Sequence, residues 1–103
     1  MIVLPDGRLQ VQGAVNQFTV PALQPAGEAL VCEADRVVNF SNVTTVDSSA
    51  LALILAWKRA ARAAGHTLSV EAAPVALRNL ASLYGVSAII FPEQQGSDAR
   101  AQS

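Results

Sequence analysis

The sequence predicts one α/β domain with a mixed, mostly parallel sheet of about five strands and three to four helices. Its 103 residues fit a single domain and leave no room for a second. Hydrophobic residues make up 51% and charged residues 15%, a balance that supports a packed core rather than a disordered chain. Short apolar runs alternate with helical patterns, which is typical of crossover connections between parallel strands.

The N-terminal segment is expected to form a hairpin, and this hairpin makes the sheet mixed. Residues 1–4 have the composition of an extended segment, and residues 5–7 (Pro-Asp-Gly) have the composition of a turn. Across residues 8–15 polar and apolar side chains alternate, as they do in a half-buried strand.

A short helix and a buried strand are expected next. Thr19 is a suitable N-cap for a helix over residues 20–30, although Pro25 and Gly27 weaken the interior of that helix. The run Arg-Val-Val-Asn-Phe at residues 36–40 indicates a buried strand, and residues 41–45 are expected to form the loop after it.

The strongest helical pattern begins after residues 47–49 (Asp-Ser-Ser), whose side-chain oxygens suit the free N–H groups of a helix start. The pattern continues to about residue 64, and Gly65 is a natural C-cap.

The C-terminal third is expected to hold a strand over residues 67–71, a helix from residue 74 to Gly85 and a last strand over residues 86–91. Residues 93–103 are polar and are expected to be a disordered tail, so the folded domain should span residues 1–92. The expected core consists of the inward-facing apolar side chains of these elements: Leu9, Val11, Val38, Phe40, Leu53, Ile54, Trp57, Leu68, Val70, Leu77, Leu80 and Ile89.

The helix after residues 47–49 presents one face on which apolar and cationic residues share a stripe. On a helical wheel of about 100° per residue, five residues fall on this exposed stripe: Ser48, Leu51, Leu55, Arg59 and Arg62. Isolated surface leucines are common on soluble proteins and need no function. Alternatively, apolar residues rimmed by arginines are typical of a partner-binding surface.

The two serines at the start of this helix also have two interpretations. Helix capping explains them without any further role. A phosphate at the same place would be stabilised by the free N–H groups of the helix, and its charge would repel a partner docked on this face.

Residues 38–51, Val-Asn-Phe-Ser-Asn-Val-Thr-Thr-Val-Asp-Ser-Ser-Ala-Leu, resemble the signature of STAS domains, which occur in sulfate transporters and anti-sigma factor antagonists. The resemblance covers about residues 8–92, and within the family the chain is most similar to MlaB-like proteins. Two positions depart from the family pattern: Asn39 replaces its usual Asp, and Ala50 replaces its usual Gly.

The resemblance implies a cytoplasmic subunit that docks on the MlaF-like ATPase of an MlaFEDB-like phospholipid-transport ABC complex. Through the ATPase the subunit would reach a permease, lie peripheral to the inner membrane and support outer-membrane lipid asymmetry. The expected partner-binding residues are Asp47, Ser48, Ser49, Leu51, Leu55, Arg59 and Arg62, with Ser48 at the ATPase contact.

The alternative that the resemblance implies is an anti-sigma factor antagonist whose partner is a serine kinase or anti-sigma factor. Phosphorylation of Ser49 or Ser48 would switch such a protein. The departures at Asn39 and Ala50 favour the transporter subunit, because Ala50 makes the helix start bulkier for a kinase than glycine would.

Neither an enzyme nor a metal or cofactor site is expected. His66 is the only histidine and Cys32 the only cysteine, so these residues provide neither a metal-ligand set nor an intrachain disulfide. Ser48 and His66 would lie roughly 27 Å apart along the helix, which excludes a catalytic triad. Nucleic-acid binding is disfavoured because the net charge is -1. Direct membrane insertion is disfavoured because the longest apolar run, residues 50–57, is too short.

Overall fold

The structure is a computed structural model that describes residues 1–92. Its elements follow the chain in this order: β1 (Ile2–Val3), β2 (Leu9–Val15), α1 (Val20–Val31), β3 (Arg36–Val46), α2 (Ser48–Ala63), β4 (Leu68–Glu71), α3 (Val75–Leu83) and α4 (Ser87–Ile90). The predicted tail, residues 93–103, lies outside the described residues.

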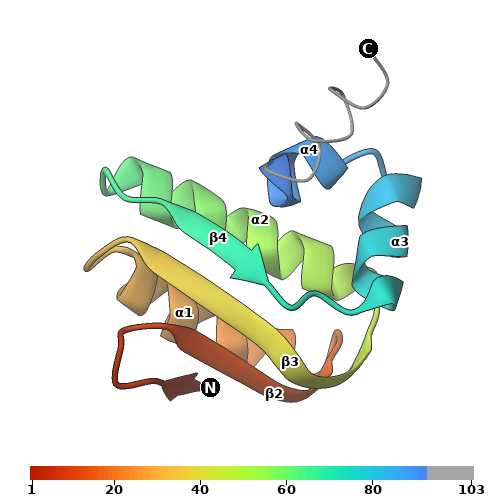
Figure 1. Cartoon of the computed structure of the whole chain (residues 1–103), viewed down its shortest axis with the longest axis horizontal. Helices are drawn as coiled ribbons and strands as arrows, with labels where there is room; N and C mark the ends of the chain where they lie inside the picture. The colour runs from red at the N-terminus through yellow and green to blue at the C-terminus, as the bar shows by residue number, and fades with distance from the viewer. Residues whose placement is uncertain (93–103) are drawn as a thin grey trace.

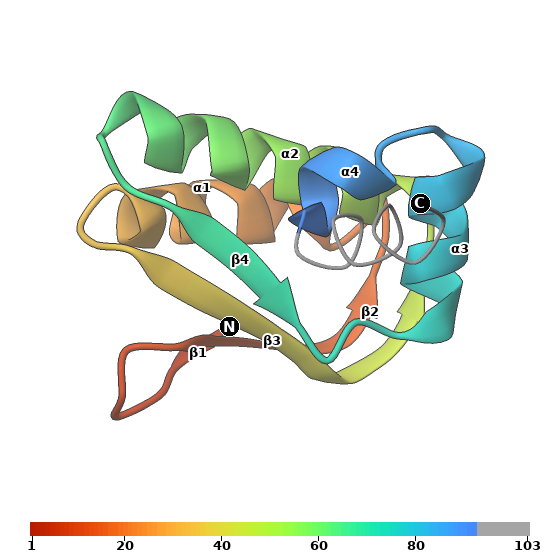
Figure 2. The ribbon, with the colours of Figure 1, turned by 45° about the horizontal axis from the view of Figure 1, so that its top comes forward.

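The strands of this part of the chain form one sheet in the order β1-β2-β3-β4. β1 pairs antiparallel with β2, whereas β2 with β3 and β3 with β4 are parallel. The two crossover helices, α1 and α2, lie side by side over the same face of the sheet (Figure 2). α3 stands at the end where α2 begins, and α4 lies alongside α2 (Figure 1). The mixed, mostly parallel sheet predicted from the sequence is therefore confirmed.

The core lies between the sheet and the helices α1 and α2. Nine of the predicted core residues are buried: Leu9, Val11, Val38, Phe40, Leu53, Ile54, Trp57, Leu68 and Leu77. Val70 and Leu80 are half-buried and pack against this cluster. Ile89 was expected to join them, but it is 56% exposed.

β3 extends past the predicted strand, so residues 41–45 are not the expected loop. The extension pairs with β2, where Gln12 lies opposite Asn42 and Val15 opposite Val46. Register shifts within this pairing interrupt the regular alternation of buried and exposed side chains. Because the two threonines of the segment are β-branched, they fit a strand as well as they fit a loop.

The predicted fifth strand over residues 86–91 is wrong, because this segment forms the short helix α4. Gly85, at φ +72°, ends α3, and the N–H groups of Ile90 and Phe91 then donate to carbonyls four residues back, at 3.0 and 2.7 Å. Consecutive residues Ile90 and Phe91 are buried while Ile89 points outward. A six-residue apolar run does not distinguish a strand from a helical turn by periodicity, and the packing of Ile90 and Phe91 on the core decides for the helix.

Helices α1 and α2 approach closely at one glycine. The indole ring of the fully buried Trp57 lies against Gly27, and a Cβ atom built on this glycine would lie 2.1 Å from the ring atom Cε2. Trp57 Nε1 also donates to the carbonyl oxygen of Gln24 at 3.0 Å. Gly27 is unfavourable for the α1 backbone, but it makes room for the largest side chain of the core.

Ala72, in the connection from β4 to α3, adopts a left-handed backbone with φ 55°. A side chain with a Cβ atom is strained in this region by roughly 1 kcal/mol, and glycine is not. Ala72→Gly is therefore expected to raise the free energy of unfolding by about 0.5–1 kcal/mol, measured by urea denaturation. Ala73→Gly serves as the control, because it removes the methyl group of the neighbouring residue, whose φ is not positive. A destabilised Ala72→Gly variant would contradict the expectation.

Candidate functional site

The N-terminus of α2 is fixed by its cap. Asp47 has an extended backbone, and its carboxylate accepts a hydrogen bond from the Ser49 N–H at 2.8 Å. The Asp47 N–H donates in turn to the carbonyl oxygen of Val15, which ties the helix start to the end of β2. Asp47 and Ser49 are half-buried, whereas Ser48 is exposed. Of these three predicted site residues, Ser48 is the one most available to a partner.

The predicted stripe along α2 is partly corrected by the structure. Leu51 is only 5% exposed and belongs to the core, and Leu55 is half-buried. Arg59 and Arg62 are exposed, as the wheel predicted. Ala52 is exposed and takes the outward position expected for Leu51, and two residues after α3, Tyr84 and Val86, line the same hollow as Leu51.

A groove runs along α2 on this side. Its first part is a hollow of about 320 Å³, and Leu51 lies at its floor beside five other lining residues: Ser48, Ala52, Leu55, Tyr84 and Val86. Its second part is a hollow of about 300 Å³ that shares Leu55 with the first and is also lined by Lys58, Arg59, Arg62 and Ile89. These two hollows together are called the α2 groove.

One wall of the α2 groove comes from α3 and α4, which the sequence did not link to α2. Tyr84 is 59% exposed and Ile89 56%, so apolar surface is available to a partner. Leu83, beside Tyr84, is also strongly exposed. These residues were missed because nothing in a sequence pattern shows which helix end will pack beside α2.

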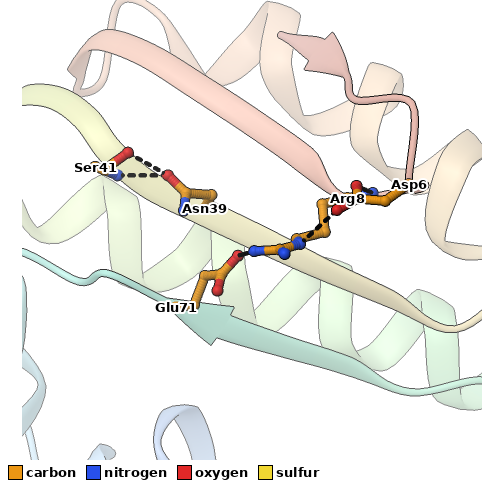
Figure 3. A network of polar contacts seen from close by, with 5 residues as sticks. All are labelled: Asp6, Arg8, Asn39, Ser41 and Glu71. Carbon is orange, nitrogen blue, oxygen red and sulfur yellow. Dashed lines mark hydrogen bonds and ion pairs between the residues drawn. The ribbon is translucent and has the colours of Figure 1, made fainter.

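The opposite face of the sheet carries a separate polar network (Figure 3). The Arg8 guanidinium donates to Asp6 at 2.9 Å and to Glu71 at 2.6 Å, so it links the start of β2 with β4 across β3. Asn39 accepts hydrogen bonds from the backbone N–H and the hydroxyl of Ser41. Asn39, one of the two positions at which this chain departs from the STAS pattern, therefore lies away from the α2 groove and has a local structural partner.

The ion pair between Arg8 and Glu71 gives a pH-dependent contribution to stability. The hydrogen bond from Arg8 holds the pKa of the Glu71 carboxyl below its usual range. A carboxyl with a lowered folded-state pKa stabilises the fold above its unfolded value of about 4.5, and this contribution disappears as pH falls through the folded pKa. Glu71→Gln is therefore expected to cause a small loss of stability at pH 7, because both groups are well exposed to solvent.

Urea unfolding at pH 7 and pH 3 checks this expectation. The difference between the wild-type chain and Glu71→Gln should shrink at the lower pH, because pH 3 lies below the unfolded-state pKa of about 4.5 and the stabilisation declines from there toward the lowered folded-state pKa. A difference that is larger at pH 3 than at pH 7 would contradict it.

Among residues 1–92, no three His, Cys, Asp or Glu side chains gather as a potential metal site. No helix within these residues combines the length and the apolar character that a membrane crossing requires.

The fold belongs to a recognisable class of small α/β domains, in which two parallel crossovers place both helices on one face of a mixed sheet. The family model described as "Mlab, STAS domain" matches residues 4–91. The chain therefore belongs to this STAS family, and the predicted similarity to MlaB is confirmed. A comparison with curated proteins gives no match.

Two solved structures show the same fold. The structure described as "Structure of the Anti-Sigma Factor Antagonist SpoIIAA in its Unphosphorylated Form" has a TM-score of 0.67 and 15% identity, and the match covers 91% of this chain and 87% of that one. The "Crystal Structure Analysis of Mglu" has a TM-score of 0.56 and 26% identity, over 66% of this chain. The match covers only 17% of the Mglu chain, so it concerns a part of that protein.

Proposed function

We propose that the chain is a non-catalytic docking subunit that binds the ATPase of an MlaFEDB-like phospholipid-transport ABC complex through the α2 groove. The observation that carries the proposal is the apolar hollow between Ser48 on α2 and the exposed Tyr84, in a chain whose family is described as Mlab. In this role the protein is cytoplasmic and lies peripheral to the inner membrane through its partners. It supports assembly or activity of the transporter and, with it, outer-membrane lipid asymmetry.

The composition of the α2 groove supports docking. Interfaces favour an apolar centre with aromatic anchors and arginines at the rim. Here Leu55 lies where the two hollows meet, Tyr84 stands at one end, and Arg59 and Arg62 stand at the other. The helix α2, which carries most of the residues that line the groove, is anchored by the buried Trp57, so the surface is held rigidly before a partner arrives.

The alternative is an anti-sigma factor antagonist that is switched by serine phosphorylation. The fold that the chain shares with SpoIIAA supports this alternative. Ser48 is exposed at the helix start and would be accessible to a kinase. Ser49 is half-buried, and its N–H is already bonded to the Asp47 carboxylate, whose negative charge would oppose a phosphate nearby. This geometry favours static docking over a switch at Ser49.

Affinity purification of the tagged chain from gently solubilised cells of its source, followed by mass spectrometry, tests the proposal. Recovery of an ABC ATPase together with its permease would support it. Recovery of a small serine kinase or anti-sigma factor without a transporter would overturn it and support the switch.

Two substitutions at Ser48 separate a role in docking from a role in helix capping. Ser48→Ala is expected to leave partner binding nearly unchanged, because Asp47 rather than Ser48 caps the helix. Ser48→Arg is expected to weaken binding by at least about tenfold, since a long side chain would fill the hollow. Both variants should unfold at the wild-type urea concentration, and calorimetric titration with the purified partner measures the affinities. Equal affinities for Ser48→Ala and Ser48→Arg would remove Ser48 from the interface.

A further inference from the structure

Charge is distributed unevenly over this nearly neutral chain. The sequence has eight acidic and seven basic residues, for a net charge of -1. Lys58, Arg59 and Arg62 nevertheless gather on the second part of the α2 groove, and Lys58, Arg62 and His66 line the hollow that continues it past Ile89. No Asp or Glu lines any of these three hollows in the described part of the chain. The groove is thus cationic within a slightly acidic protein.

Within residues 1–92 the acidic side chains have partners other than Arg59 and Arg62. Asp6 and Glu71 pair with Arg8 on the open face of the sheet, and Glu33 pairs with Arg36. Asp35 contacts His66, and Asp47 caps α2.

The two arginines of the groove differ from Arg8 and Arg36, which are paired with acidic side chains. Within residues 1–92, Arg59 and Arg62 form no ion pair, and both are exposed. Lys58 differs, because its ammonium group donates to the Leu68 carbonyl oxygen at 2.8 Å. The groove therefore presents two guanidinium groups whose fixed planar donors match a carboxylate.

The apolar and cationic parts of the α2 groove lie in a defined order. Ser48 and Tyr84 stand at the start of α2, and Arg62 stands fourteen positions later, which is about 21 Å along the helix. A ligand that follows the groove must therefore be apolar at one end and negatively charged at the other.

We propose that the α2 groove binds a segment of a protein partner that is apolar where it meets Tyr84 and Leu55 and acidic where it meets Arg59 and Arg62. This inference rests on the proposed docking role of the groove and assigns the chemistry of the segment that occupies it. The arginines steer the acidic end and set the direction of the segment, and the apolar hollow holds it once bound.

An anionic membrane surface is a different class of ligand for cationic residues, and the observations favour the protein segment. Electrostatic membrane binding is typical of clusters of about four to eight Lys or Arg residues, whereas three line this part of the groove. The apolar residues of the first hollow also line a concave surface between α2 and the end of α3 rather than a protruding one.

Two matched synthetic peptides test the proposal on the full-length chain. Each is an amphipathic peptide of about fifteen residues with leucines at one end, and the other end carries three glutamates in one peptide and three lysines in the other. NMR titration of the isotope-labelled protein should show the Glu peptide binding at least about tenfold more tightly than the Lys peptide. The shifted amides should lie in residues 48–62 and 84–89, and the preference should weaken as salt is added.

A pair of double variants with the same change in net charge provides the control. Arg59→Gln with Arg62→Gln removes two positive charges from the groove and should abolish the preference for the Glu peptide. Ala22→Glu with Ala26→Glu adds two negative charges at exposed positions of α1, outside the groove, and should retain the preference. Loss of the preference in both double variants to the same degree would show a net-charge effect and overturn the proposal.

Three further outcomes would also overturn it: equal binding of the two peptides, shifts mapping outside the groove, or binding to phosphatidylglycerol vesicles with no binding of the Glu peptide. Failure here is distinguishable from failure of the proposed function. If an ABC ATPase co-purifies with the chain but associates equally fast with the Arg59→Gln, Arg62→Gln variant, the docking role stands and the acidic segment is refuted. If no ATPase co-purifies, the docking role on a transporter fails, while the peptide preference still decides the chemistry of the groove.

Discussion

Gly27→Ala is expected to destabilise the domain by about 3 kcal/mol, the upper end of the usual cost of overpacking a core. The added Cβ atom would lie 2.1 Å from Trp57 Cε2 and 2.3 Å from Nε1, and the indole ring is fully buried and cannot move into solvent. Helix propensity alone predicts the opposite sign, since alanine is favoured over glycine inside a helix by about 1 kcal/mol. The sign of the measured change therefore separates tertiary packing from local propensity.

Urea unfolding followed by far-UV circular dichroism measures this change. Trp57→Phe removes the indole nitrogen and the larger ring, so Gly27→Ala should cost clearly less in that background than in the wild-type chain. Ala29→Gly makes the reverse substitution at an exposed position of the same helix, so its change in unfolding free energy measures the difference in helix propensity alone. A neutral or stabilising Gly27→Ala would mean that α1 and α2 are less closely packed than the structure shows.

Ala52→Arg is expected to reduce binding to the proposed ATPase partner by at least about thirtyfold, corresponding to the 2 kcal/mol or more of an interface hot spot. Ala52 is exposed and lines the first hollow beside Ser48, so an arginine would fill the space that the partner must enter without disturbing the core. Leu51→Asp is not suitable for this purpose, because Leu51 is buried and a charge there would unfold the domain.

Ala63→Arg is the matched control, since it makes the same substitution at an exposed position of α2 that does not line the groove. It should bind the partner with wild-type affinity, and both variants should keep the wild-type unfolding midpoint. Calorimetric titration with the purified ATPase measures the two affinities. Equal affinities for Ala52→Arg and Ala63→Arg would place the interface elsewhere on the molecule.

The sequence by itself determined the family, the alternation of strands and helices, and the start of α2. Each of these is a local property. Asp47 caps the helix through its own neighbour Ser49, and Leu53 and Trp57 face the core because of the helical period. The position of Arg59 and Arg62 on the exposed side of α2 follows from the same period.

Only the tertiary structure decided what lies beside that exposed side. The residues that follow α3 and the helix α4 lie beside α2, which brings Tyr84 and Ile89 to the groove. Leu51 joins the core, and the expected last strand is a helix. Periodicity describes one element at a time, so it gives the orientation of a side chain relative to its own helix axis. A surface such as the α2 groove is completed by residues of a distant element. The free energy of packing the whole chain decides which residues these are, and the periodicity of one helix does not show it.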